Sequence, residues 1–194
     1  MKRRFALSAV GCLSIGAIFF PLHLALAAEA TTEFEILEKA SVRALEWFRA
    51  MAAPLTEIVT AEERTQLLEA LSDLSKDLYA IEQDKLVFIQ LLKRDKLDKG
   101  AIYSRTSNLM QSIEKARQSL RKVGPLLRQR YQLGGVEVEA LLSEAAITRK
   151  IWVNQLYDAP DDVAQRQDVI AEGEKALTAL REANTELAKL IARL

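Results

Sequence analysis

The sequence predicts an all-α protein, an up-and-down antiparallel helical bundle with long coiled-coil-like helices. Apolar residues recur at intervals of three and four through most of the chain, which is the spacing of one helix face. Only 7 Gly and 4 Pro occur in 194 residues, too few for a fold rich in tight turns. No segment of strand length alternates strictly between apolar and polar residues. Short connections between long helices favour antiparallel neighbours.

The first two helices are predicted over residues 32–53 and 61–99. Each begins with a Thr-x-x-Glu capping box, and the first stops before Pro54. Gly100 follows several cations, as a glycine does after the end of a helix. The two apolar rows are Phe34, Leu37, Ala44, Leu45, Phe48 and Met51, then Leu67, Leu71, Leu74, Leu78, Ile81, Phe88 and Leu92.

Three further helices are predicted over residues 102–132, 137–157 and 161–194. Pro125 predicts a kink in the first of them, because proline removes a backbone hydrogen bond from a helix. The Gly-Gly pair at 134–135 predicts a break before the second. Their apolar rows are Ile102, Leu109, Ile113, Ala116, Leu120, Val123 and Leu127; Val138, Leu142, Ala145, Trp152 and Leu156; and Val163, Ile170, Leu177, Leu180, Leu187, Ile191 and Leu194.

Residues 1–27 have the features of a cleavable secretory signal peptide. Three basic residues precede an apolar stretch over residues 5–20, and an Ala-x-Ala sequence precedes the expected cut before Ala28. An uncleaved membrane anchor is the alternative, because the stretch is long enough to span a bilayer. Either interpretation places residues 28–194, a single helical-bundle domain, in the periplasm or outside the cell.

The composition of this domain excludes several kinds of chemistry. His23 and Cys12, the only histidine and cysteine, both lie within residues 1–27. The segment also holds three of the 27 basic residues and no acidic one, so its removal leaves 24 basic and 27 acidic residues. A disulfide, a thiol nucleophile, a histidine triad and a His- or Cys-ligated metal are therefore excluded. The acidic pairs lack EF-hand spacing and suit helix N-termini. We predict no catalytic residues, no metal and no cofactor.

Three polar residues lie where the apolar rows predict buried side chains: Lys85, Arg166 and Asn184. A polar residue at such a position can fix the register of a bundle at some cost in stability. The alternative is that these side chains line a ligand cavity between helices. We favour register-setting or partly exposed positions, with Lys85 and Arg166 each meeting an acidic partner across the bundle.

Charge is unevenly distributed along the chain. Residues 114–130 contain six basic residues and one acidic residue, whereas residues 158–174 contain six acidic residues and one basic residue. Arg117, Arg121 and Arg128 share one face of the predicted helix and form a candidate docking strip for lipid headgroups or an acidic protein. We favour the alternative that the two segments neutralise one another or are simply solvated.

These features favour a binding function over an enzymatic one. We expect an exported, non-enzymatic helical protein that binds a protein partner in the cell envelope, as an adaptor, a chaperone-like holder or a toxin inhibitor. A sensor or carrier of a small ligand or hard cation is the first alternative, and a membrane-active bundle is the second. Contact with a membrane surface and self-association are also compatible with the sequence. The export signal and the slightly acidic domain argue against nucleic acid as a partner.

Overall fold

The part of the chain that the structure describes contains five long α-helices, one short 3-10 helix and no strand. This computed structural model describes residues 33–52, 61–94, 96–158 and 163–194. The predicted signal peptide and the side chains of Trp152, Leu156 and Val163 lie outside the described residues. The elements are α1 (Glu33–Ala52), α3 (Ala61–Leu92), α4 (Lys99–Val123), the short 3-10 helix η1 (Gly124–Leu126), α5 (Gln129–Asp158) and α6 (Val163–Arg193). The predicted all-α class is confirmed.

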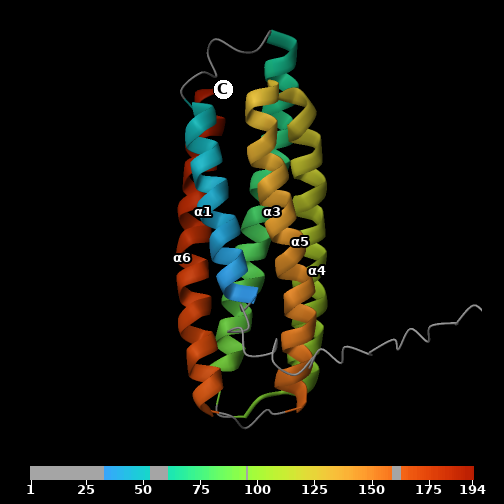
Figure 1. The fold of residues 1–194 in the computed structure, drawn as a ribbon, viewed down its shortest axis with the longest axis vertical. Helices are drawn as coiled ribbons and strands as arrows, with labels where there is room; N and C mark the ends of the chain where they lie inside the picture. The colour runs from blue at the N-terminus through green and yellow to red at the C-terminus, as the bar shows by residue number, and fades with distance from the viewer. Residues whose placement is uncertain (1–32, 53–60, 95, 159–162) are drawn as a thin grey trace, which may run out of the picture. The chain divides into compact units, whose positions relative to one another are not determined.

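The five helices form a closed ring (Figure 1). α1 lies between α5 and α6, α3 lies between α4 and α6, and α4 also contacts α5. Successive helices run in opposite directions, as an up-and-down bundle requires. Five alternating helices in a ring must leave one parallel pair, and here that pair is α1 and α6. α1 therefore separates α5 from α6, although α5 and α6 follow one another in the chain.

The predicted apolar rows meet inside the ring and form one core. Every apolar residue predicted for the rows of α1, α3 and α4 is buried. In α6 the predicted row is partly wrong, because Ile170 and Ile191 lie at the edge of the core. The buried row of α6 instead includes Val169, Ala176, Ala183 and Leu190.

Leu78 provides a test of this core. Its side chain is 3% exposed, whereas that of Tyr79, the next residue on α3, is 57% exposed. We expect Leu78→Asp to abolish cooperative thermal unfolding, measured by circular dichroism, because it places an unpaired carboxylate in an apolar interior. Tyr79→Asp is the matched control and should unfold like the parent. A Leu78→Asp protein that melts as cooperatively as the parent would contradict the core assignment.

The helix end predicted at Gly100 is wrong. α3 ends at Leu92, and Gly100 lies in the first turn of α4. Asp98 caps this turn, because its Oδ1 accepts hydrogen bonds from the backbone N–H groups of Gly100 and Ala101, at 2.9 and 3.2 Å. These N–H groups have no partner within the helix, so the capping carboxylate fixes the start of α4 at this point.

The kink predicted at Pro125 is a turn between two helices. α4 ends at Val123, η1 follows, and Leu127 has an extended backbone, with φ −101° and ψ 150°. Proline has no N–H group to donate and a fixed φ, so Pro125 suits the beginning of a short 3-10 turn. The helix predicted over residues 102–132 is therefore interrupted, and α5 begins at Gln129.

The break predicted at Gly134 and Gly135 is also wrong, because both glycines lie inside α5. They make room for the indole of Trp47 on α1. A Cβ atom at Gly134 would lie 2.8 Å from Cγ of Trp47, and one at Gly135 would lie 3.1 Å from Cζ2. The indole Nε1 donates a hydrogen bond to the backbone oxygen of Tyr131, at 2.7 Å. Trp47 is 4% exposed and belongs to the core.

Candidate functional site

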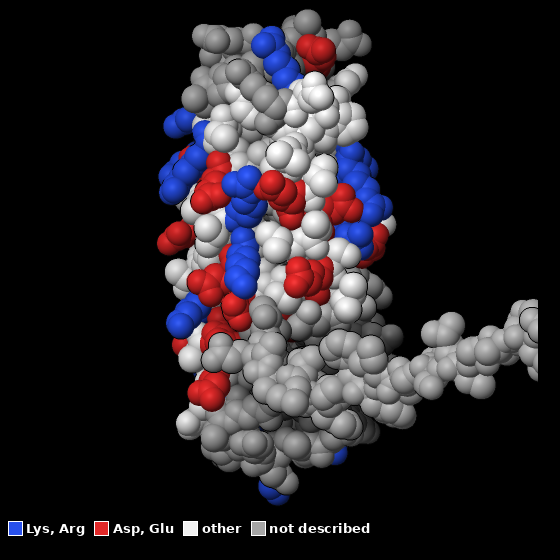
Figure 2. Space-filling view, in the orientation of Figure 1, with Lys and Arg blue, Asp and Glu red and all other residues white. Residues whose placement is uncertain are grey.

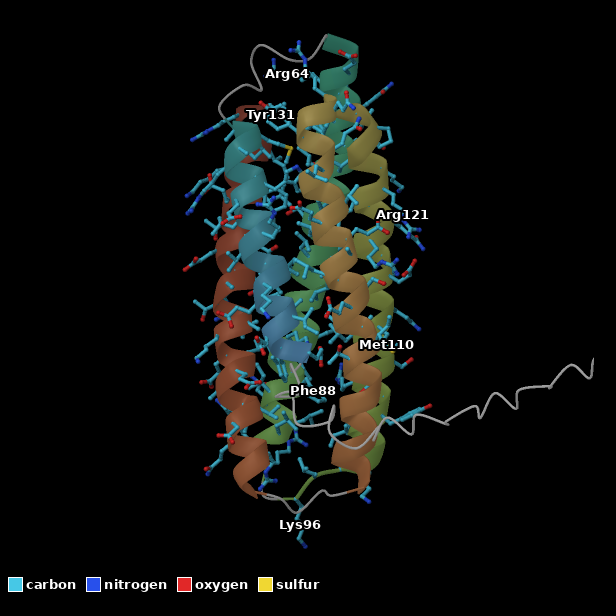
Figure 3. All side chains as sticks on the ribbon, viewed as in Figure 1. Arg64, Phe88, Lys96, Met110, Arg121 and Tyr131 are labelled. Carbon is cyan, nitrogen blue, oxygen red and sulfur yellow. The ribbon has the colours of Figure 1, made fainter. Side chains whose placement is uncertain are left out.

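Lys85 lies in the core as one half of a buried ion pair. Its Nζ on α3 contacts Oε1 of Glu33 on α1, and both side chains are 1% exposed. The same Nζ lies 4.2 Å from the ring centroid of Phe34, which is a cation–π geometry. The Phe34 ring centroid lies 6.4 Å from that of Phe88, inside the bundle (Figure 3). Lys85 thus meets the acidic partner expected across the bundle, and the pair links α1 to α3.

The other two polar positions lie nearer the surface. Nδ2 of Asn184 donates to Oε2 of Glu82 at 2.9 Å, and Nε of Arg181 donates to Oε1 of the same carboxylate at 3.0 Å. Asn184 and Glu82 also border an open hollow of about 610 Å³ between α3 and α6. Arg166 donates to the backbone oxygen of Arg94 at 3.1 Å, where we expected an acidic side chain.

The predicted docking strip does not form one helical face. Arg117 and Arg121 come together on α4, and each lies within 3.4 Å of Oε1 of Glu139 on α5. A hydrogen bond to Glu139, and then the charge of that carboxylate, raises the pKa of Arg121. Arg128 follows the end of α4 and so lies outside the helix that was predicted to carry it. Arg121 lies on the outer side of α4 (Figure 3), and two of the three arginines are paired within the bundle.

A groove runs between α1 and α5, where the sequence predicted no site. It is open to solvent and has a volume of about 790 Å³. Val42 of α1 and Ala140 and Leu141 of α5 form its apolar lining. Its charged lining consists of Glu35, Glu38, Lys39, Arg43, Glu46 and Glu137. The groove therefore combines apolar contact surface with carboxylates.

A second hollow extends the groove along the same two helices. It has a volume of about 220 Å³ and shares Arg43 and Glu46 with the first. Tyr131, which lies near the start of α5, also lines it (Figure 3). The other lining residues are Trp47, Ala50, Leu133 and Gly134. The two hollows together follow α1 from Glu35 to Ala50.

Further exposed apolar side chains lie along α5, and one of them, Leu133, also lines the second hollow. Leu133, Val136 and Ile147 are 62%, 60% and 63% exposed, and Val42 across the groove is 43% exposed. With Ala140, the three α5 residues recur at helical spacing on the side opposite the core. The sequence shows this row as apolar residues at helical spacing, but that spacing alone predicts no site. Figure 2 shows uncharged surface and acidic side chains over α5, beside a column of Lys and Arg side chains over α1.

Both cations of the groove are already paired. Lys39 lies 2.9 Å from Glu35, and Arg43 lies 2.8 Å from Glu46 and also contacts Glu137. Among the described residues, the lining holds four carboxylates and these two cations. The described lining therefore carries a net negative charge.

The environment of Lys39 agrees with a net negative charge in the groove. A hydrogen bond to Glu35, and then the charges of Glu35, Glu144 and Glu38, raise the pKa of Lys39. A raised pKa means that the surroundings favour the cationic form. The same field attracts any other cation that approaches the groove.

The α1–α5 groove is the strongest candidate site among the described residues. These residues contain no group of three or more His, Cys, Asp or Glu side chains that could hold a metal ion. No helix in the described ranges is long and apolar enough to cross a membrane. Comparisons of the chain with protein-family models, curated proteins and solved structures found no match. What the groove offers chemically is apolar contact with an acidic border, which suits binding.

Proposed function

We propose that this protein is an exported, non-enzymatic binding protein that holds a partner protein in the α1–α5 groove. The observation that carries the proposal is the apolar lining of the groove, formed by Val42, Ala140 and Leu141, with the exposed side chain of Leu133 in its second hollow. Contiguous exposed apolar surface beside charged residues is typical of interaction sites. Export rests on the signal-peptide features of residues 1–27. An envelope adaptor, a chaperone-like holder and a toxin inhibitor would all use such a surface.

The groove supports this function better than the arginine strip does. Arg117 and Arg121 already pair with Glu139, so a partner would have to compete with an existing ion pair. The apolar side chains of the groove have no such internal partner at their exposed faces. A partner that covers these side chains removes apolar surface from water. This burial favours the complex by roughly 25 cal/mol per Å² of apolar surface.

Crosslinking in living cells tests the proposal. A photo-crosslinking amino acid replaces Val42 in the full-length chain, and adducts from the envelope fraction are identified by mass spectrometry. We expect one dominant protein adduct, because position 42 lines the groove and is exposed. The matched control carries the same crosslinker at Ala171, an exposed residue of α6. No protein adduct at position 42, or the same adducts at both positions, would contradict the proposal.

A further inference from the structure

The length of the groove indicates what kind of segment occupies it. From Glu35 to Ala50 the two hollows follow α1 for about 22 Å, which matches a helix of about 15 residues. The described backbone on both sides is helical, so its N–H and C=O groups are paired within α1 and α5. An extended peptide would find no strand edge here, whereas an amphipathic helix can lay its apolar face between two helices.

The charge of the groove indicates the composition of that segment. Among the described lining residues, four carboxylates exceed two cations, and both cations are held by carboxylates of the groove itself. Glu144 adds a further carboxylate near Lys39. An acidic or lipid-phosphate partner would be repelled, and a basic one would be attracted.

We infer that the α1–α5 groove binds a cationic amphipathic helix of a partner protein, with its apolar row on Val42, Ala140 and Leu141 and its Lys or Arg residues towards the carboxylates. This inference rests on the proposed function and specifies the partner. Apolar contact supplies the affinity, and the carboxylates select the sign of the partner's charge.

Two synthetic peptides test the inference. Both are helical and about 15 residues long, with Leu on one face. One carries Lys beside that face, and the other carries Glu at the same positions. We expect the Lys peptide to bind the purified protein at least about tenfold more tightly than the Glu peptide, measured by fluorescence anisotropy. Its affinity should fall as salt is raised, because the selecting charges are exposed.

Variants of the groove complete the test. Ala140→Arg places a long cationic side chain on the apolar lining. It should lower the affinity for the Lys peptide at least about tenfold. Ala171→Arg, at an exposed position of α6, should leave binding unchanged. Glu38→Lys combined with Glu144→Lys should reverse the preference for the Lys peptide. Circular dichroism melts establish that each variant is folded.

Equal binding of the two peptides, or binding that Ala140→Arg leaves unchanged, overturns the inference. Tight binding of the protein to phosphatidylglycerol vesicles also overturns the inference. A dimer of this chain that Ala140→Arg dissociates overturns it as well, because a second copy would then occupy the groove. If the Val42 crosslinker captures a protein while the peptides bind equally, the proposed function stands and only the cationic helix is refuted. If position 42 captures no protein, the proposed function itself fails.

Discussion

We expect Lys85→Ala to lower the free energy of unfolding by about 3–5 kcal/mol. The substitution removes the cation that faces Glu33 and leaves that carboxylate, which is 1% exposed, without its charge partner. It also removes the cation over the Phe34 ring. An uncompensated charge in an apolar interior costs more free energy than the intact pair supplies. Urea denaturation followed by circular dichroism measures the loss.

A double variant separates the charge effect from loss of side-chain volume. Glu33→Leu combined with Lys85→Met replaces both charges with apolar side chains of similar length. We expect its stability to be close to or above that of the parent, because a buried ion pair gains little over apolar packing. A loss of unfolding free energy below about 1 kcal/mol in Lys85→Ala is the value expected of a solvated ion pair. Such a result would contradict the buried position of the pair between α1 and α3.

We expect Gly134→Ala to destabilise the protein by about 1–3 kcal/mol, although alanine is the better helix former. The new Cβ would lie 2.8 Å from Cγ of Trp47 and closer still to Cδ1, so the indole must move. That movement disturbs its hydrogen bond to Tyr131 and its contacts in the core. Thermal and urea unfolding of the variant and the parent measure the effect.

Gly124→Ala is the matched control for this substitution. Beyond its two chain neighbours, nothing lies within 4 Å of a Cβ at Gly124, whose backbone lies in the α region with φ −49° and ψ −54°. We expect it to change stability by less than about 1 kcal/mol, because the reduced freedom of the unfolded chain is opposed by the strain of a Cβ directly before Pro125. Equal effects of the two alanines would contradict the close approach of Trp47 to α5.

The core of this protein was predictable because its pattern is local. The apolar row of α3 keeps three- and four-residue steps from Leu67 to Leu92, interrupted only by Lys85, and its residues are buried. Such a row identifies the inner face of a helix without knowledge of its neighbours. The row predicted for α6 is partly wrong, because alanines such as Ala176 and Ala183 are buried there in place of larger apolar residues.

Helix ends were less predictable, because a glycine has more than one structural use. Gly134 resembles a helix breaker, but its environment is set by Trp47, which is distant in the chain. Gly100 resembles a C-terminal cap, yet Asp98 two residues earlier caps the start of the next helix. For Gly134, the contact with Trp47 decides that the glycine lies inside a helix. For Gly100, the capping geometry of Asp98 decides that the glycine begins a helix and does not end one.

The groove could not be predicted from the sequence because it depends on the order of helices in the ring. Val42 and Ala140 line it together only because α1 lies beside α5. Periodicity indicates which face of a helix is buried, but it does not indicate which helices are neighbours. The same long-range order brings Glu33 to Lys85. Leu133 and Ala140 of the outward apolar row of α5 are the part of this surface that the local pattern shows.

The yield of the Val42 adduct in living cells, compared between the parent chain and Ala140→Arg, tests binding in the α1–α5 groove most directly. Both chains carry the crosslinker at position 42, and Ala171→Arg serves as the control. We expect one protein adduct in the parent and the control, and its loss in Ala140→Arg, because the arginine obstructs the apolar lining. An adduct of the same protein at undiminished yield in folded Ala140→Arg would contradict binding in this groove.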